Sequence, residues 1–297
     1  METELRNAIR KLLEEKTVDV AIGYGRVGVG GAVGAVFVTS PDEVDQLVWN
    51  NECRQNLAVH LTRPEIKALG KIAIVVKACD ARAVVVLANE SQIKREEIVV
   101  VGVVCEGVVK ARFDGSNGEQ FFEKCASCVE HAPKNVDVLI GDEAKAAELD
   151  AKNAPTAAAS GNQAKLAKLR AMTSEERFQY WRGEFSRCVR CYACRQSCPL
   201  CYCNRCVADK NRPTRIETSA SMKGVFAWNL LRAFHLAGRC VSCGSCAAAC
   251  PAGIELDLLN LTLVNAAKEH FNYVAGEPGV PPLIGTYSLD DEEDFIR

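Results

Sequence analysis

Two cysteine runs in the second half of the chain share one spacing. They are Cys188-Val-Arg-Cys191-Tyr-Ala-Cys194-Arg-Gln-Ser-Cys198-Pro199 and Cys240-Val-Ser-Cys243-Gly-Ser-Cys246-Ala-Ala-Ala-Cys250-Pro251. Both read C-x2-C-x2-C-x3-C-P, a spacing that binds 4Fe–4S clusters. Three closely spaced cysteines wrap around one cube, while the fourth binds the other cluster. The proline after the fourth cysteine ends the loop.

This crossed pattern divides eight cysteines into two predicted ligand sets. The first is Cys188, Cys191, Cys194 and Cys250, and the second is Cys240, Cys243, Cys246 and Cys198. The alternatives are a zinc ribbon or scattered buried thiols, but zinc knuckles come as separated C-x2-C pairs. We therefore expect two 4Fe–4S clusters and a function in electron transfer.

Three more cysteines, Cys201, Cys203 and Cys206, follow the first run directly. They could complete an additional metal site with one further ligand from elsewhere. They could also form a shell that hydrogen-bonds and tunes a neighbouring cluster, or be ordinary buried cysteines. The sequence does not choose among these.

The first half contains a second candidate metal site. Cys79 follows one apolar run, Cys105 ends another, and Cys125-Ala-Ser-Cys128 is a C-x2-C pair on a predicted loop. Since ligands gather at the carboxyl ends of parallel strands, these four cysteines could converge on one site. A third 4Fe–4S cluster is our interpretation; zinc and plain core cysteines are the alternatives. Cys53 has no assigned role.

A glycine-rich stretch follows the first predicted strand. Gly23-x-Gly25-x-x-Gly28 resembles a dinucleotide fingerprint, but a β-like run follows it where that fingerprint requires a helix. A wide hairpin is therefore the favoured interpretation. Because such a loop lets backbone approach a ring closely, the three glycines remain a candidate FAD contact. His131 and His235 are interpreted as local hydrogen-bonding residues.

Composition excludes several classes of function. The chain has 297 residues, 36 basic and 38 acidic side chains and 16 cysteines. A net charge of −2 gives no electrostatic basis for binding nucleic acid. No basic and apolar leader opens the chain, and the apolar runs are too short for the roughly 20 residues of a membrane span. We expect a cytoplasmic protein with reduced, metal-binding thiols. No hydrolytic triad, P-loop or catalytic carboxylate pair is evident.

The elements of the first half predict an α/β domain over about residues 1–150. A helix is expected over 2–15, and strands over 18–22, 33–38, 71–77, 98–104 and 136–140, with a crossover helix over 80–90. Strands and helices alternate, and two of the strands are continuous β-branched runs, which indicates a largely parallel sheet.

The second half predicts an all-α domain that holds two clusters, a helical ferredoxin. Residues 151–172 lack a large core pattern and are interpreted as a linker. Thr173 and Glu176 form a predicted capping box that opens a domain over 173–275, with further helices over 222–237 and 254–270. An extended tail over 276–297 ends in an acidic run, 290–294, interpreted as a solvated end; a binding arm for a partner subunit is the alternative.

The N-terminal motifs resemble those of a known family. Lys77-Ala-Cys79-Asp80-Ala-Arg82, Gly102-Val-Val-Cys105-Glu106-Gly107 and Lys124-Cys125-x-x-Cys128 are similar to segments of the β subunits of deazaflavin-coenzyme hydrogenases and formate dehydrogenases. The resemblance covers about residues 17–145 and implies that Cys79, Cys105, Cys125 and Cys128 hold a 4Fe–4S cluster. Phe234-His-Leu-Ala-Gly-Arg-Cys240-Val-x-Cys243 resembles the two-cluster domain of heterodisulfide reductase and succinate dehydrogenase subunits.

This combination implies an accessory iron–sulfur subunit of an anaerobic redox complex of the heterodisulfide-reductase, formate dehydrogenase or hydrogenase type. It would relay single electrons between a flavin-bearing partner and another redox protein. The alternative is a catalytic β subunit whose own FAD exchanges hydride with a deazaflavin or nicotinamide coenzyme. A zinc-stabilised scaffold is the third hypothesis. The α/β domain is shorter than that of the family, and no residue matches a known flavin contact.

Overall fold

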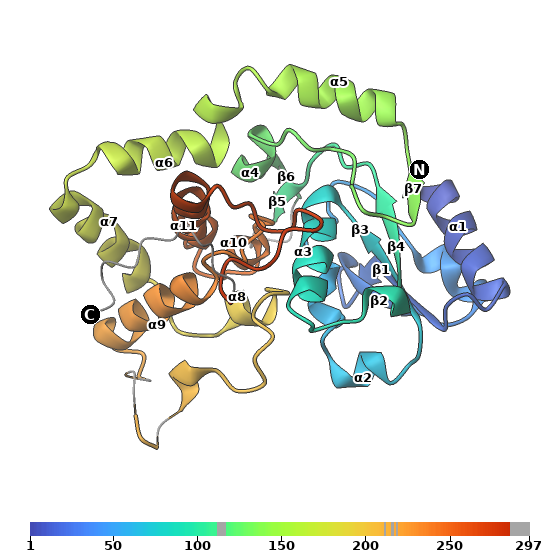
Figure 1. Ribbon diagram of the computed structural model, residues 1–297, viewed down its shortest axis with the longest axis horizontal. Helices are drawn as coiled ribbons and strands as arrows, with labels where there is room; N and C mark the ends of the chain where they lie inside the picture. Colours follow the sequence, from blue (N-terminus) through green and yellow to red (C-terminus); the bar gives the residue numbers. More distant parts are fainter. Residues whose placement is uncertain (112–116, 211, 215–216, 218, 286–297) are drawn as a thin grey trace.

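A five-stranded sheet forms the centre of the first half of the chain (Figure 1). The computed structural model describes residues 1–111, 117–210, 212–214, 217 and 219–285. The strand order is β2-β1-β3-β4-β7, with bounds β1 Val20–Val27, β2 Ala32–Val38, β3 Ile72–Val76, β4 Ile98–Val103 and β7 Val138–Ile140. Only the β1–β2 pair in this sheet is antiparallel. The expected largely parallel α/β domain is confirmed.

The β-branched runs form the most deeply buried strands. All five residues of β3 are buried, as are five of the six residues of β4. Apolar side chains on both faces remove the strand from water, which is why no polar alternation appears in its sequence. Helices α1 (Glu2–Glu14) and α3 (Ala78–Asn89) contribute Leu5, Ile9 and Leu87 to the same core.

The glycine-rich stretch forms a hairpin, as predicted. Gly23 and Gly25 lie within β1, which pairs with β2 from Ala21–Val38 to Val27–Ala32. Gly28 lies in the turn with a φ of +66°, a left-handed conformation that glycine adopts without strain. In place of the helix N-terminus that a dinucleotide fingerprint requires, β2 follows this turn directly.

Shorter elements complete the α/β half. A second sheet pairs β5 (Val109–Ala111) with β6 (Asn117–Phe121), and α4 (Glu123–Ala126) follows it. Helix α2 is Pro64–Lys67, and 3₁₀ turns cover Pro41–Gln46, Leu57–His60 and Arg95–Glu97. Two further 3₁₀ turns, Ala157–Ala159 and Val207–Asp209, lie beyond this half.

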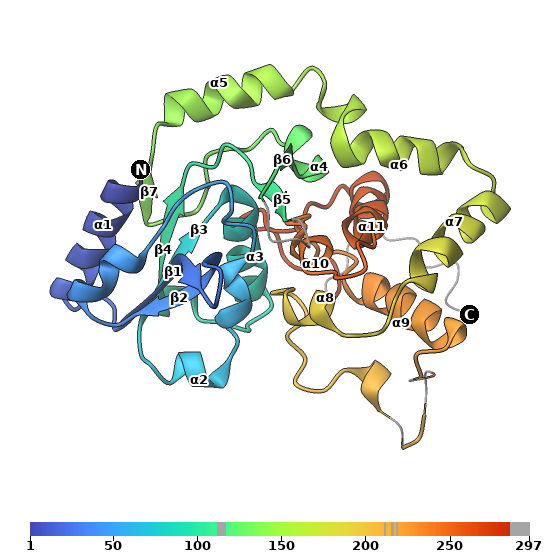
Figure 2. The same ribbon diagram turned by 180° about the vertical axis from the view of Figure 1, so that it is seen from behind.

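Two helices connect the halves across one side of the molecule. Figures 1 and 2 show α5 (Glu143–Asn153) and α6 (Gly161–Ala171) running from the sheet to the helical half. The sequence did not indicate a core role for this segment, but Leu166 and Leu169 of α6 are buried against Leu258 and Leu261. Two leucines in an otherwise alanine- and lysine-rich helix are too few to give an apolar stripe that the sequence reveals.

The second half is helical, as expected. It contains α7 (Ser174–Ser186), α8 (Ala193–Gln196), α9 (Met222–His235), α10 (Ser245–Ala248) and α11 (Leu256–Phe271). The capping box is confirmed, since Thr173 and Glu176 bond each other's backbone amides at the start of α7. Phe185, Val225 and Ile254 form the centre of a separate small core.

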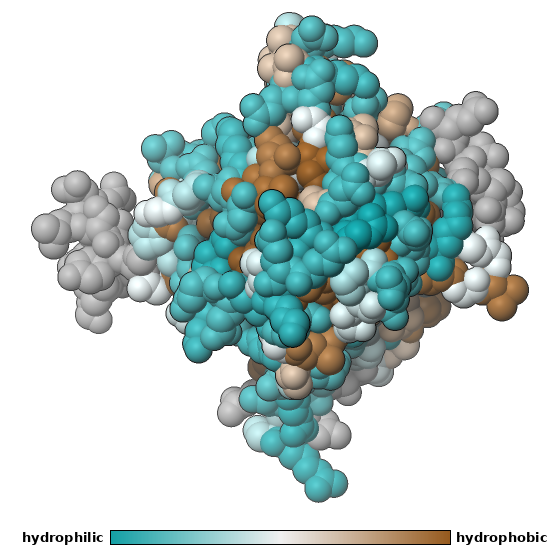
Figure 3. Space-filling view, turned by 90° about the vertical axis from the view of Figure 1, so that its right-hand side faces the viewer, coloured by the Kyte–Doolittle hydropathy of each residue, from teal (hydrophilic) through white to brown (hydrophobic). Residues whose placement is uncertain are grey.

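The tail beyond α11 returns to the α/β half. Gly276 lies against Arg82 of α3, and the Asn89 amide donates to the Val280 carbonyl. The predicted acidic run over 290–294 lies outside the described residues. Figure 3 views the α/β end of the molecule, where hydrophilic side chains cover most of the face. Within the described ranges, no helix is both long and apolar enough to cross a membrane.

Candidate metal centres

Four cysteines of the first half line one cavity at the carboxyl edge of the sheet. β3 leads to Cys79 in α3, and Cys105 follows the neighbouring β4. Cys125 lies in α4, and Cys128 follows that helix. All four line a cavity of about 350 Å³. We call these four residues the α/β group.

The four cysteines of the α/β group are half-buried. Burial raises the pKa of the thiols of Cys79, Cys105 and Cys128. Gly107 has a φ of +119°, and a Cβ there would lie 2.9 Å from the Phe121 ring. Only glycine therefore fits the turn that follows Cys105. A bound metal requires thiolates, so binding would release protons from these thiols.

A buried ion pair lies beside the α/β group. Lys77 and Asp80 are each 1% exposed, and their charged atoms are 2.5 Å apart. The Tyr24 hydroxyl and the Gln55 carbonyl accept further hydrogen bonds from the Lys77 ammonium. Burial alone would lower the pKa of Lys77, but the Asp80 carboxylate together with the Cys79 and Cys105 side chains raises that pKa. Lys77 also lines the cavity and brings positive charge to it.

The two cysteine runs interleave in the helical half. Cys188, Cys191, Cys194 and Cys250 line one small pocket, and we call them the outer group. Cys198, Cys240, Cys243 and Cys246 line another, and we call them the inner group. Each pocket therefore takes three cysteines from one run and the proline-adjacent cysteine of the other run.

The two runs also repeat one backbone path. Arg190 and Ser242, each two residues after the first cysteine of its run, have φ values of 58° and 56°. Tyr192 and Gly244, each directly after the second cysteine, have φ values of 62° and 71°. Three of these four residues carry a side chain that disfavours this left-handed region. A strained path repeated at matched positions indicates that both loops wrap an object of the same shape.

Each group offers the four cysteine sulfurs that a 4Fe–4S cluster binds. Across the described ranges, no three histidine, cysteine or acidic side chains lie close enough together to bind one metal ion. Four sulfurs around one zinc must all lie about 2.3 Å from it. In a 4Fe–4S cube each cysteine binds its own iron, so the four sulfurs lie farther apart. The residues present fit a cluster at each of the three groups.

Two cations whose contacts the motifs did not reveal lie between the groups, the half-buried Lys124 and the buried Arg232. Lys124 Nζ is 3.8 Å from Cys79 Sγ and donates to the Cys243 carbonyl. Arg232 is 6% exposed, and its Nη2 donates to the Cys194 carbonyl at 3.0 Å. Burial would lower the pKa of Arg232, but the thiols of Cys246, Cys198, Cys201 and Cys194 raise it well above its ordinary value.

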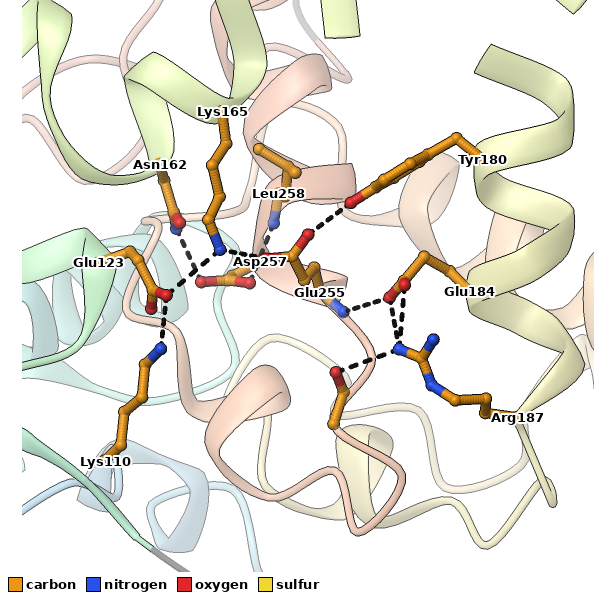
Figure 4. A network of polar contacts seen from close by, with 11 residues as sticks. Lys110, Glu123, Asn162, Lys165, Tyr180, Glu184, Arg187, Glu255, Asp257 and Leu258 are labelled. Carbon is orange, nitrogen blue, oxygen red and sulfur yellow. Dashed lines mark hydrogen bonds and ion pairs between the residues drawn. The ribbon is translucent and has the colours of Figure 1, made fainter. Parts of the chain in front are cut away.

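A network of polar contacts joins α4, α6, α7 and α11 beside the outer group (Figure 4). Lys165 of α6 bridges Glu123 and Glu255. Glu255 also accepts from the Tyr180 hydroxyl, and its amide donates to Glu184 at 3.1 Å. Burial and this hydrogen bond raise the pKa of Tyr180. The network fixes the turn between Cys250 and α11.

Cys201, Cys203 and Cys206 line one small pocket together with His235 and Arg232. Cys203 and His235 are exposed, whereas Cys201 and Cys206 are half-buried. The hydrogen bond between the Cys201 and Cys198 side chains lowers the pKa of Cys201. Cys201 therefore adjoins the inner group. This position is compatible with a shell that tunes the neighbouring cluster and with an additional metal site. Both remain predictions.

The other singled-out residues lie apart from these pockets or support them. A Cβ on Gly23 would lie 2.4 Å from Leu47, and one on Gly25 would lie 2.6 Å from Val36, while nothing lies near Gly28. FAD binding by these glycines stays a prediction. Cys53 is fully buried in the sheet core, and burial raises its pKa to about 11. His131 hydrogen-bonds Asp150, as predicted.

Residues 184–254 match the family model described as a 4Fe–4S dicluster domain, which includes both cysteine runs. The helical half bears this 4Fe–4S dicluster domain. The two predicted clusters of the helical half thus have independent support, and the chain is an iron–sulfur protein.

Two curated relatives extend the similarity to most of the chain. The F420-dependent formate dehydrogenase subunit beta of Methanocaldococcus jannaschii is 24% identical over 92% of this chain and 91% of its own length. The F420-dependent formate dehydrogenase 1 subunit beta of Methanococcus maripaludis is 24% identical over 66% of this chain and 70% of its own. The expected similarity to formate dehydrogenase β subunits is confirmed, and it reaches well beyond residues 17–145.

Proposed function

We propose that this chain is the electron-transfer subunit of a cytoplasmic oxidoreductase complex in anaerobic energy metabolism. It relays single electrons between a flavin-bearing partner and another redox protein. Its partners would be formate dehydrogenase, hydrogenase or heterodisulfide-reductase-like subunits. A bound 4Fe–4S cluster supplies reversible one-electron chemistry.

One observation carries the proposal. Twelve of the 16 cysteines gather in three groups of four that each line one pocket, although each group includes members from distant parts of the chain. This arrangement supports ligation of three clusters, including the crossed ligation by Cys198 and Cys250. The protein's own residues hold the sulfurs, exclude water and place Lys77, Lys124 and Arg232 beside them, which tunes the potential.

A catalytic β subunit with its own flavin is the second candidate, favoured by the names of the two relatives, which are F420-dependent enzymes. Against it, the candidate glycines Gly23 and Gly25 lie under close-packed side chains.

Anaerobic purification separates the two candidates. Iron, sulfide and flavin are measured per chain, and reduced F420 and NADH are then added to the isolated chain. The relay predicts iron and sulfide in equal amounts, no flavin, and no reduction by either coenzyme without the partner. Stoichiometric flavin that is bleached by a reduced coenzyme would establish the catalytic subunit. Tightly bound zinc without iron would exclude both.

A further inference from the structure

The inner group lies between the other two groups. Cys240, Cys243 and Val241 pack on the core of the α/β half. Arg82 Nη2 of α3 donates to the Val241 carbonyl at 3.3 Å, and Ser242 lines the cavity of the α/β group. The inner group is therefore held directly against the sheet's carboxyl edge.

The outer group lies on the far side of the inner group. Cys188, Cys194 and Cys250 pack on a separate core with residues of α7, α9 and α11. Cys191 is exposed, and the neighbouring Val189 is 69% exposed. Of the three groups, this one presents a ligand directly to the surface.

Lys124 spans the gap between the α/β group and the inner group. Its ammonium contacts Cys79 Sγ on one side and the Cys243 carbonyl on the other. Its stem lies against Gly244, where a Cβ would come within 2.8 Å of the Lys124 Cδ. In the described part of the chain it forms no ion pair with a carboxylate, so its charge acts on the sulfur groups.

Arg232 spans the gap between the inner and outer groups. Its Nη2 donates to the Cys194 carbonyl of the outer group at 3.0 Å, and its side chain lines a pocket with Leu200 and Cys201, which follow Cys198 of the inner group. Its Nε has no hydrogen-bond partner among the described residues, and no described carboxylate pairs with it. A buried cation without a counter-charge is costly. Anionic clusters on both sides would supply the missing charge.

We propose that electrons pass through the three groups in series, in the order α/β, inner and outer. Lys124 lies between the first two groups and Arg232 between the last two, and each cation sets the reduction potentials of the clusters on either side of it. The inference rests on the proposed function. With a 4Fe–4S cluster held by the cysteines of each group, one cluster would be oxidised by one electron and its neighbour reduced by that electron, with no bond made or broken. A one-electron carrier protein exchanges the electron at the exposed Cys191 end.

The charges of the two cations fix the sign of their effect. Reduction adds one negative charge to a cluster, and a fixed cation nearby stabilises that charge. Each cation therefore raises the reduction potentials of the two clusters beside it. Of Lys124 and Arg232, the inner cluster would have both as neighbours and each of the other two clusters only one, while Lys77 adds a further cation at the α/β group.

The test is an EPR-monitored redox titration of the full chain, prepared anaerobically, as wild type, Lys124→Met and Arg232→Met. The Cys125→Ser/Cys128→Ser variant identifies the signal of the α/β group. Lys124→Met should lower the potentials of the α/β and inner clusters, each by about 59 mV, a tenfold change for one electron. The outer cluster should not change. Arg232→Met should instead lower the reduction potentials of the inner and outer clusters.

Matched variants control the experiment. Lys124→Arg and Arg232→Lys keep the charge and should restore the potentials, which a purely structural role would not predict. Arg182→Met removes an exposed cation from α7 and should shift nothing, because water and salt screen it. If the reduction potentials of all three clusters shift equally, or if that of the inner cluster does not shift, the proposed series order is wrong.

A second measurement covers the case in which a variant loses its clusters. In fully reduced protein, neighbouring paramagnetic clusters speed each other's spin relaxation. Loss of the α/β cluster in Cys125→Ser/Cys128→Ser should slow relaxation of the inner signal and leave the outer signal unchanged. A change confined to the outer signal contradicts the series. Wild-type protein without iron would instead refute the proposed function itself, so the two failures are distinguishable.

Discussion

Single cysteines show how ligand assignment follows from spacing. The sequence alone predicts that Cys198 belongs with the run that starts 42 residues later, and Cys198 lines the pocket of Cys240, Cys243 and Cys246. Replacing Cys198 with serine should therefore damage the inner cluster more than the outer one.

Anaerobic EPR of Cys198→Ser beside Cys250→Ser checks this assignment. Because the two fourth ligands are exchanged between runs, the two variants should show opposite patterns of signal loss. Loss of only the outer signal in Cys198→Ser would mean that each run binds its own cluster.

The buried pair Lys77–Asp80 gives a second prediction. Lys77→Met leaves the Asp80 carboxylate buried without its cation, which should cost roughly 3–5 kcal/mol of stability. The urea midpoint of the anaerobic, iron-loaded protein measures the loss. Lys94→Met breaks the exposed pair with Glu97 and should leave the midpoint unchanged. The double variant Lys77→Met/Asp80→Leu should recover much of the loss; an unchanged midpoint in the single variant would be inconsistent with a structural ion pair.

Not every role in the site could be found from the sequence. The cysteine groups follow from spacing and from strand ends, because both are local patterns. Lys124 stands in the motif Lys124-Cys125-x-x-Cys128, but its contact with Cys243 joins elements that pack together only in the folded chain. Arg232 stands in no ligand motif, and no local signal could have found it.

Helices and strands followed their patterns where one physical cause dominated. The buried runs of β3 and β4 and the hairpin of β1 and β2 were predictable, since burial on both faces and the glycine turn each leave a signature. The packing of helix α6 could not be predicted in this way. Two of its leucines pack on α11 and Lys165 forms an ion pair with Glu123, and both are tertiary contacts.

The capping box of α7 gives a prediction for one element. Thr173→Ala removes the side-chain acceptor for the Glu176 amide and should cost the helix about 1 kcal/mol. Hydrogen exchange of the amides in the first turn of α7 should then speed up several-fold. Arg182→Ala, on the exposed face of the same helix, serves as the control. Equal exchange rates in wild type and Thr173→Ala would show that the cap is dispensable.

The whole molecule depends on contacts that hold its two halves together. The strap of α5 and α6 joins them, and Lys165 connects α6 with both Glu123 of the α/β half and Glu255 of the helical half. This geometry keeps the α/β and inner groups on opposite sides of Lys124.

Lys165→Met should loosen this junction without unfolding either half. The pairs are partly exposed, so we expect a loss of about 1 kcal/mol or less, seen as faster limited proteolysis between α5 and α6. As a control, the protein carrying Lys168→Met, at an exposed position one turn away, should be cleaved at the wild-type rate. Cleavage that is unchanged in Lys165→Met would mean that apolar packing alone holds the strap.

Iron analysis of the anaerobically purified chain tests the central claim most directly. Three groups of four cysteines predict about 12 irons and 12 sulfides per wild-type chain, and about 8 of each in Cys125→Ser/Cys128→Ser. Equal iron contents in the two proteins, or zinc in place of iron, would contradict the account.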